Sequence, residues 1–419
     1  MAQPTFRTHV GMTDILPDEV GKWQALEQII RDEAKKFNFE EIRTPIMEQT
    51  ELIARGVGQL TDIVSKEMFA FERGDDQYVL RPECTAPVAR AFVQHHLDQR
   101  GGTQNLYYIG PMFRAEKPQK GRQRQFHQFG AEIIGADDPA ADVDIITLMM
   151  AIYDRVGISN TTLKINSVGD PESRKAYTKA LKEHFHPELP QMSAISRERF
   201  EKNPLRILDS KEEEDQSFIE DAPVITDYLT EETADHYRRV KQLLTDLNIP
   251  FEEDPYLVRG LDYYTRTAFE LISPDLGAQD ALGGGGRYDL LIEEVGGQPT
   301  PAVGFASGME RLLIACKELG IDLVEEAMLD VYIVTLGDEA RTWALKHLPK
   351  LRGAGLSASM DYIGRSIKSQ MKDADRENAR HVIIVGGNEL AEGKFTLRNM
   401  RESEESAYSF DKIMQRLVE

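Results

Sequence analysis

Two alternating segments in the first third of the chain restrict its fold more than any other feature. Leu106–Glu116 and Gln123–Ile134 alternate apolar and polar residues, and the polar sequence KPQKGR joins them. Alternation with a period of two is typical of half-buried strands, and two such strands joined by a polar loop are typical of a hairpin. We therefore predict an antiparallel hairpin with a long, basic tip.

The segments around this hairpin differ in the spacing of their apolar residues and in their content of charged residues. Residues 21–38 carry apolar residues at helical spacing, and the following FEEIRTPIME is typical of a strand interrupted by Pro45. Residues 170–250 are highly charged and favour helices, so we expect an inserted helical subdomain there. Strand-like sequence resumes at Tyr256–Ile272 and at Gly283–Tyr288.

The last part of the chain alternates strands with helices. DVYIVTL, LSASMDY and HVIIVGG read as strands with helical sequence between them, which predicts a small, largely parallel α/β sheet. A chain of 419 residues is too long for one ordinary core. We predict a first domain at residues 1–325, which contains the insertion, and a second at residues 330–419.

Composition excludes several classes of protein. No apolar run could span a bilayer, and the start MAQPTFRTHVGMTDILP lacks the pattern of a secretion signal, so we expect a cytoplasmic protein without a membrane partner. Cys84 and Cys316 form no CxxC pair, which disfavours a disulfide framework or a thiolate zinc site. The net charge of −21 argues against a general polyanion binder. Residues 330–419 are neutral, however, with 14 Lys+Arg and 14 Asp+Glu, and could bind RNA through a local patch.

One face of the predicted hairpin combines charged, aromatic and amide side chains. Residues two apart on a strand share a face, and the residues concerned are Arg114, Glu116, Arg124, Phe126, Gln128, Gly130 and Glu132. An ordinary half-solvated hairpin also has a polar outer face. The basic loop adds weight to the alternative, a contact with phosphate or nucleic acid.

Three later segments are typical of ligand binding, and each has a structural alternative. In LVRGLDYY (Leu257–Tyr264), Arg259 could form a structural ion pair or bind a phosphate or carboxylate. GGGGRYD (Gly283–Asp289) could be a flexible loop, but the alternation around it favours a strand close under a ligand. In AVGFASGMERLL, Arg311 could simply face solvent from a helix.

The order of these segments resembles the histidine–tRNA ligases, a family of class II aminoacyl-tRNA synthetases. FRAE and FHQFGAE resemble motif 2 of that class, GFASGMERLL resembles motif 3, and FNFEEIRTPIME resembles motif 1, which forms the homodimer interface around a proline, here Pro45. LVRGLDYY and GGGGRYD resemble the two signatures of the family, and RPECTAP and NPLRILDSK also match. The resemblance implies an α+β catalytic domain built on an antiparallel sheet, with a helical insertion, and a C-terminal α/β anticodon-binding domain.

The resemblance implies that ATP binds over the sheet. Arg114 corresponds to the arginine that holds the α-phosphate, Glu116 to the residue that reads the adenine amino group, and Phe126 to the ring stacked on adenine. Arg311 corresponds to the arginine that meets the γ-phosphate, and Arg122 lies in the loop that contacts the triphosphate or the tRNA acceptor end. Mg²⁺ would neutralise the phosphates.

The resemblance also implies a pocket for L-histidine. Groups on Glu83, Thr85 and Gln128 would receive the α-amino group. The imidazole would lie between Glu132 and Tyr264, with Tyr263 beside them. Arg114 and Arg259 also belong to the implied histidine-binding set, and Arg259 would lie between the amino acid and the α-phosphate.

The implied reaction begins when the histidine carboxylate attacks the α-phosphorus and diphosphate leaves. Arg114 and Arg259 would be the catalytic residues and would offset the charge that develops. The ribose hydroxyl of tRNA(His) would then take the histidyl group and release AMP.

The sequence departs from the family pattern at one place, and two other functions fit it less well. The family usually begins with Arg-Gly-Met-x-Asp, whereas Val10 precedes Gly11 here. We expect the missing arginine to weaken the contacts that this N-terminal segment makes. A catalytically silent relative, such as the regulatory subunit of ATP phosphoribosyltransferase, lacks the anticodon domain and loses synthetase residues that this chain retains. A ligase for another amino acid is disfavoured by the two family signatures.

Overall fold

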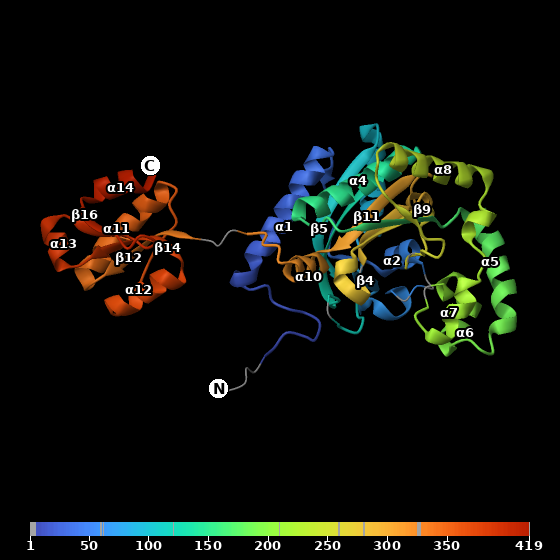
Figure 1. Cartoon of the computed structure of the whole chain (residues 1–419), viewed down its shortest axis with the longest axis horizontal. Coiled ribbons are helices and arrows are strands. Elements are labelled where there is room, and N and C mark those ends of the chain that lie inside the picture. Colours follow the sequence, from blue (N-terminus) through green and yellow to red (C-terminus); the bar gives the residue numbers. More distant parts are fainter. Residues whose placement is uncertain are drawn as a thin grey trace. The chain divides into compact units, whose positions relative to one another are not determined.

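The chain divides into two units, Met1–Leu323 and Val324–Glu419, and each is described by itself. The computed structural model, drawn in Figure 1, describes residues 6–58, 61, 63–119, 121–208, 210–258, 260–279, 281–324 and 328–418. Within these ranges no helix is long and apolar enough to cross a membrane.

An eight-stranded sheet forms the centre of the first unit. Its order is β1 (Glu40–Glu41), β5 (Gln104–Phe113), β6 (Gln125–Ile134), β11 (Ala302–Gly308), β10 (Ala281–Arg287), β9 (Thr265–Ile272), β7 (Thr162–Ser167) and β8 (Glu252–Glu253). All pairings from β5 to β7 are antiparallel, and only the outer strands β1 and β8 pair in parallel. The predicted hairpin is confirmed, because Leu106 pairs with Glu132 and Phe113 with Gln125.

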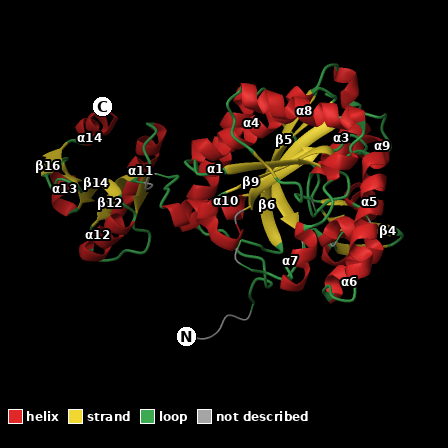
Figure 2. Cartoon of the chain, turned by 45° about the vertical axis from the view of Figure 1, so that its right-hand side comes forward, coloured by secondary structure: helices red, strands yellow, loops and turns green. Residues whose placement is uncertain are grey.

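Helices cover both faces of this sheet (Figure 2). One face packs in the largest core with helices α1 (Pro17–Lys36), α4 (Pro139–Val156), α8 (Glu231–Asp246) and α10 (Met309–Leu319). The other face packs in a second core with α3 (Thr85–Gln94) and α9 (Leu291–Glu294), beside α2 (Thr50–Val57). Strand alternation sorts the residues between the faces, so Tyr107 enters the first core and Tyr108 the second. A small sheet of β2 (Met47–Gln49), β4 (Asp76–Leu80) and β3 (Phe69–Arg73) lies near α2 in the chain.

The helical insertion has a core of its own. Helices α5 (Pro171–Phe185), α6 (Ala194–Lys202) and α7 (Glu213–Glu220) bury Tyr177, Leu181, Phe200 and Ile219 together. Helix α8 lies in the predicted insertion but packs against the main sheet through Tyr237, Val240 and Leu244. The independent part of the insertion is therefore shorter than residues 170–250.

The strand predicted for Tyr256–Ile272 is wrong in its first half. Strand β9 begins only at Thr265, and the described residues before it form turns and bends. Arg266 has a φ of 48°, and the register between β9 and β10 shifts there. Most of LVRGLDYY is therefore a loop that leads into the sheet.

The second unit is a five-stranded sheet with helices. Its order is β13 (Ala358–Met360), β12 (Leu329–Thr335), β14 (Ala379–Val385), β15 (Phe395–Asn399) and β16 (Glu405–Tyr408). The first three strands are parallel, as expected, whereas the last two add antiparallel pairings. The helices are α11 (Asp338–Gly353), α12 (Ile367–Arg376), α13 (Gly387–Glu392) and α14 (Phe410–Val418).

Candidate active site

Glycines on β10 and β11 make room for larger side chains of the same protein. A Cβ atom on Gly304 would lie 1.6 Å from Glu132 Oε2, and one on Gly286 would lie 2.9 Å from the ring of Tyr264. No residue with a side chain fits there unless its neighbour moves. The space beside the glycine-rich strand is thus occupied first by Glu132 and Tyr264, and a ligand would meet these side chains.

Glu132 is the most deeply buried carboxyl group on this face, with 1% of its surface exposed. Thr85 Oγ1 donates a hydrogen bond of 2.8 Å to Glu132 Oε1, and Tyr288 Oη donates one of 2.6 Å to Glu132 Oε2. Burial raises the pKa of Glu132 to about 8, although both hydroxyl groups act to lower it. The group can therefore exchange a proton near neutral pH.

Glu83 provides a second buried carboxyl group beside the first. It precedes α3 and accepts hydrogen bonds from the backbone N–H groups of Thr85, at 2.7 Å, and Ala86, at 3.0 Å. Burial raises the pKa of Glu83, while these bonds and the charge of Arg114 act to lower it. Two buried carboxyl groups side by side favour a ligand that brings a positive charge.

Three tyrosine rings surround the two carboxyl groups. The ring centroids of Tyr263 and Tyr264 are 4.6 Å apart, and those of Tyr263 and Tyr288 are 5.6 Å apart. All three are at least 94% buried. Burial raises the pKa of Tyr263 and of Tyr288 well above the usual value, so both stay protonated and can donate hydrogen bonds.

Gln128 lies on the same face, further along β6. It pairs with Gly110 on one side and Gly308 on the other, neither of which has a side chain. Its Oε1 atom is buried and has no hydrogen-bond partner among the described residues. A buried amide oxygen without a partner is costly, and a ligand with an N–H group would satisfy it.

A group of cations lies at the other end of β6. Arg122 Nη1 is 3.6 Å from Glu116 Oε2, and Arg311 donates a hydrogen bond of 2.8 Å to the carbonyl oxygen of Ala281. Burial lowers the pKa of Arg311, and the positive charge of Arg122 lowers it further. Two guanidinium groups close enough to repel each other favour an anionic ligand.

Arg114 lies between the buried carboxyl groups and these cations. Its Nε donates a hydrogen bond of 2.9 Å to the carbonyl oxygen of Pro82, next to Glu83. Its guanidinium carbon is 5.2 Å from the centroid of Phe126, on the opposite strand. Arg114 therefore links the carboxyl groups to the aromatic ring expected under adenine.

Backbone contacts hold the hairpin in place. Glu310 Oε1 and Oε2 each accept a hydrogen bond of 2.9 Å from the backbone N–H of His127, which ties α10 to β6 next to Arg311. The carbonyl oxygen of Gly11 accepts the N–H of Arg124 at 2.7 Å. The atypical N-terminal segment thus contacts the hairpin loop through its backbone, and the side chain of Val10 beside this contact is exposed.

The arginine of GGGGRYD faces the opposite side of the sheet. Arg287 is fully buried and forms ion pairs with Asp142, on α4, and Asp289. Burial acts to raise the pKa of Asp142, but Arg287 and His236 hold it at about 2. This network is a structural anchor for β10.

The structure brings most of the predicted site residues into two neighbouring groups. The first contains Glu83, Thr85, Gln128, Glu132, Tyr263 and Tyr264, and the second contains Glu116, Arg122 and Arg311, with Arg114 and Phe126 between them. Arg259 lies outside the described residues. Tyr288 was missed, although its position two residues after Gly286 indicates the same face.

Two family models match the chain. One described as histidyl-tRNA synthetase matches residues 11–312, and one described as anticodon binding domain matches residues 330–419. The histidine–tRNA ligase of Natranaerobius thermophilus is 46% identical over 411 residues, which are 98% of each chain. That of Bacillus subtilis is 47% identical over 96% of each chain.

Solved structures agree with these matches. The apo histidyl-tRNA synthetase of S. aureus has a TM-score of 0.83 and 40% identity, and the match covers 99% of this chain and 100% of that one. A protein of Bacillus halodurans, described as an ATP phosphoribosyltransferase regulatory subunit/histidyl-tRNA synthetase, has a TM-score of 0.66 at 23% identity and shares the fold.

Proposed function

The chain belongs to the histidyl-tRNA synthetase family and attaches histidine to tRNA with ATP, and we propose that the two groups of site residues divide this reaction between them. The observation that carries the proposal is the pair of buried carboxyl groups, Glu83 and Glu132, separated by Arg114 from the cations Arg122 and Arg311. Histidine brings an ammonium group and a basic ring, and ATP brings a triphosphate. The two ends of the site complement these two substrates.

Histidine recognition rests on the carboxyl end of the site. Glu83, Thr85 and Gln128 would receive the α-ammonium group, and the free Oε1 of Gln128 supports this role. Glu132 and Tyr264 would meet the two ring nitrogens, with Tyr263 closing the pocket. The imidazole offers one donor and one acceptor when neutral, so two opposed polar partners select for both. A substrate side chain that lacks this donor and acceptor would leave a buried carboxyl group unpaired.

Adenylate formation rests on the cationic end. The histidine carboxylate is already ionised and attacks the α-phosphorus, so the protein contributes mainly by positioning and by offsetting charge. Arg114 would meet the α-phosphate, Arg311 the γ-phosphate and Arg122 the triphosphate or the acceptor end. Glu116 would read the adenine amino group, and Phe126 would stack on the ring. Arg259 is proposed as the second catalytic arginine because of its place in LVRGLDYY.

Mg²⁺ is proposed as a companion of ATP. Among the described residues, no group of three or more His, Cys, Asp or Glu side chains could hold a metal ion. This fits a cation that is bound largely by phosphates and water. Glu270, whose charge acts on Arg311, is a carboxylate that would share it. When bound, the cation would neutralise charge on the phosphates.

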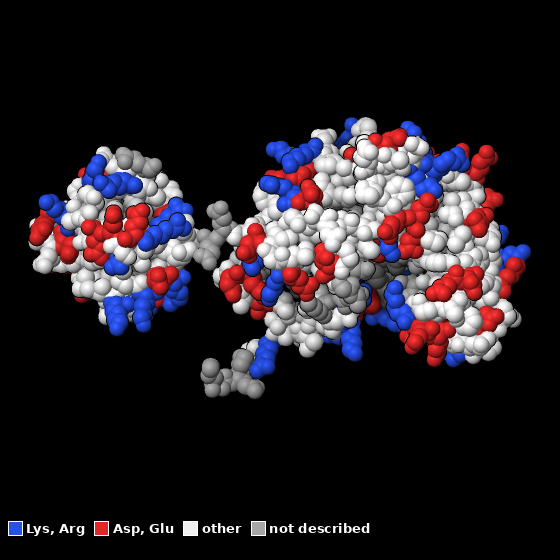
Figure 3. All heavy atoms as spheres, in the orientation of Figure 1, with Lys and Arg blue, Asp and Glu red and all other residues white. Residues whose placement is uncertain are grey.

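The second unit is proposed to bind the anticodon arm of tRNA(His). Basic side chains gather over α12 on the face of this unit seen in Figure 3, and Lys368, Lys372 and Arg376 of this helix are exposed. The patch supports contact with phosphates despite the neutral charge of the unit. A cytoplasmic location, where tRNA is charged, belongs to the same proposal.

A homodimer through the segment around Pro45 is also proposed. Ile46 and Met47, which follow it, are 44% and 52% exposed, and Phe71 on β3 is 43% exposed. Large apolar side chains exposed on and directly beside one small sheet are typical of a surface that another chain covers. Sedimentation equilibrium of the full chain and of an Ile46→Asp variant would test this, and a monomeric wild-type protein would contradict it.

The function is tested by exchange of labelled diphosphate into ATP across the amino acids. We expect exchange that depends on histidine, and loss of most of the rate in Arg259→Ala with an unchanged melting temperature. Better exchange with another amino acid would contradict the assignment to histidine, and near-normal turnover of Arg259→Ala would contradict the role of that arginine.

A further inference from the structure

The loop that carries Arg259 is held from one side by the helical insertion. Tyr256 and Val258 pack against the insertion core. The hydroxyl of Tyr256 also reaches the carbonyl oxygens of Glu220 and Ala222, both at 3.1 Å. The start of the loop is thus attached to the insertion, while its end, Tyr263 and Tyr264, belongs to the core under the catalytic face.

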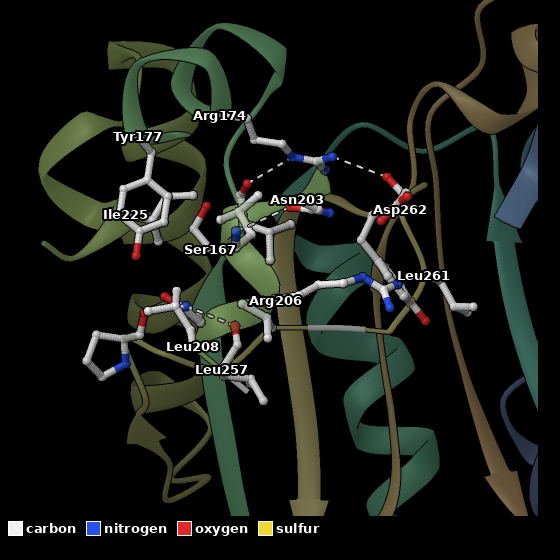
Figure 4. A pocket seen from close by; sticks show the side chains of 16 residues that line it. Ser167, Arg174, Tyr177, Asn203, Arg206, Leu208, Ile225, Leu257, Leu261 and Asp262 are labelled. Carbon is white, nitrogen blue, oxygen red and sulfur yellow. Dashed lines mark hydrogen bonds between the residues drawn. The ribbon is translucent and has the colours of Figure 1, made fainter. Parts of the chain in front are cut away.

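Two arginines of the insertion bind the backbone between these ends. Arg206 Nη2 donates to the carbonyl oxygen of Gly260 at 3.1 Å, directly after Arg259. Arg174 Nη1 donates to the carbonyl oxygen of Asp262 at 3.2 Å, as a dashed line in Figure 4 marks. Arg174 Nε also donates to the carbonyl oxygen of Val168, so this guanidinium joins α5, the end of β7 and the loop.

A cavity of about 140 Å³ lies behind the loop. Its walls come from the insertion, through Leu205 and Leu208, and from the loop, through Leu257 and Leu261 (Figure 4). Backbone next to a cavity lacks packing on that side, and its position depends more on its hydrogen bonds. The two arginines therefore contribute a large part of what determines the path of the loop.

The motif NPLRILDSK explains how Arg206 is presented. Asn203 Oδ1 accepts the N–H of Leu205 at 3.2 Å and begins the 3₁₀ helix Pro204–Ile207. Ile207 is buried in the insertion core, and the carbonyl oxygen of Arg206 accepts a hydrogen bond of 2.8 Å from Arg199. The backbone of Arg206 is thus held on the insertion while its side chain reaches the loop.

We infer that Arg206 is a positioning residue for adenylate formation, and that with Arg174 it couples the helical insertion to Arg259. A displacement of the insertion would move the Gly260 and Asp262 carbonyls, and with them the arginine between Val258 and Gly260. The inference rests on the proposed role of Arg259. It assigns to NPLRILDSK a function in the first chemical step.

The test compares three single variants of the full-length chain. Arg206→Met keeps the unbranched stem of the side chain and removes the donor, and Arg206→Lys keeps a donor. Arg197→Met is the matched control, because Arg197 donates a similar bond of 2.7 Å to the carbonyl oxygen of Met192 within the insertion. Histidine-dependent diphosphate exchange gives kcat and KM, and hydrogen exchange of the peptide covering residues 257–264 reports on the loop.

We expect Arg206→Met to lower kcat about tenfold, as loss of one charged hydrogen bond can, with smaller changes in KM for ATP. The loop amides should exchange faster, Arg206→Lys should recover most of the rate, and Arg197→Met should change neither quantity. An unchanged kcat in Arg206→Met, or an equal loss in Arg197→Met, would overturn the inference.

A double variant separates the inference from the role on which it rests. If Arg206 acts through Arg259, Arg206→Met should change the single-turnover rate of Arg259→Ala less than about twofold, because coupled residues are not additive. A further tenfold loss in that background would show that Arg206 acts elsewhere. A wild-type chain without histidine-dependent exchange would instead refute the proposed function itself.

Discussion

Replacing Tyr288 by phenylalanine should weaken histidine binding while leaving the ATP end of the site intact. The hydroxyl donates a bond of 2.6 Å to Glu132 Oε2, and both groups are buried. In the complex with histidine, Glu132 as a carboxylate would face a basic ring, and a hydrogen bond to a charged group contributes about 1.5–3 kcal/mol, where each 1.4 kcal/mol corresponds to about a factor of ten. Loss of the bond also raises the pKa of Glu132 further above about 8, which leaves less carboxylate at neutral pH. We expect KM for histidine to rise about 10- to 100-fold, with KM for ATP changed less than about threefold.

The matched control for this variant is Tyr153→Phe. Tyr153 is equally buried, and its hydroxyl bonds Ser307 Oγ and donates a bond of 2.9 Å to the carbonyl oxygen of Leu282, but it packs on the opposite side of the sheet. Both variants should lose a similar amount of stability in urea unfolding, about 1 kcal/mol. Diphosphate exchange at varied histidine concentrations measures KM. A KM for histidine within twofold of the wild type in Tyr288→Phe, or an equal rise in Tyr153→Phe, would refute the reasoning.

Three further predictions concern other parts of the chain. The pKa of Glu132 is higher in the folded chain than in the unfolded one, so the folded state binds more protons between about pH 4.5 and 8 and its stability falls as the pH rises through this range. Glu132→Gln should make this fall smaller and leave the part that comes from Glu83, whose pKa is also raised, and urea unfolding at several pH values would show whether it does. Gly304→Ala should displace the Glu132 carboxyl group and raise KM for histidine about tenfold or more. Gly353→Ala, with open space around the new methyl group, should leave this KM unchanged. The same KM for histidine in both variants would contradict the geometry. Charge reversal at Lys368 and Lys372 should impair tRNA charging in a salt-dependent way but not diphosphate exchange, and an equal loss in both assays would count against an RNA contact on α12.

Local pattern was enough to predict the hairpin and the residues on its face. The alternation in Leu106–Glu116 and Gln123–Ile134 gives the strands, and pairing then places Glu132 on one face with Gln128. The partnership of Tyr288 with Glu132 could not be predicted in this way, because it depends on β11 lying between β10 and β6.

The loop before β9 shows the same limit. Leu257–Tyr264 has the residue types of a strand, but contacts from the insertion and the bulge at Arg266 keep the described part of it out of the sheet. Such contacts join residues more than 50 positions apart, and local periodicity carries no information about them.

The overlap between Gly304 and Glu132 also has an evolutionary consequence. A chain that acquires a side chain at position 304 must shorten or relocate the carboxyl group at position 132, so the two positions are expected to vary together across descendants of this fold. Any attempt to redesign the pocket for a larger or uncharged amino acid faces the same pairing. Substitution of Glu132 alone leaves a void above the glycine, and the two positions have to be exchanged as one unit.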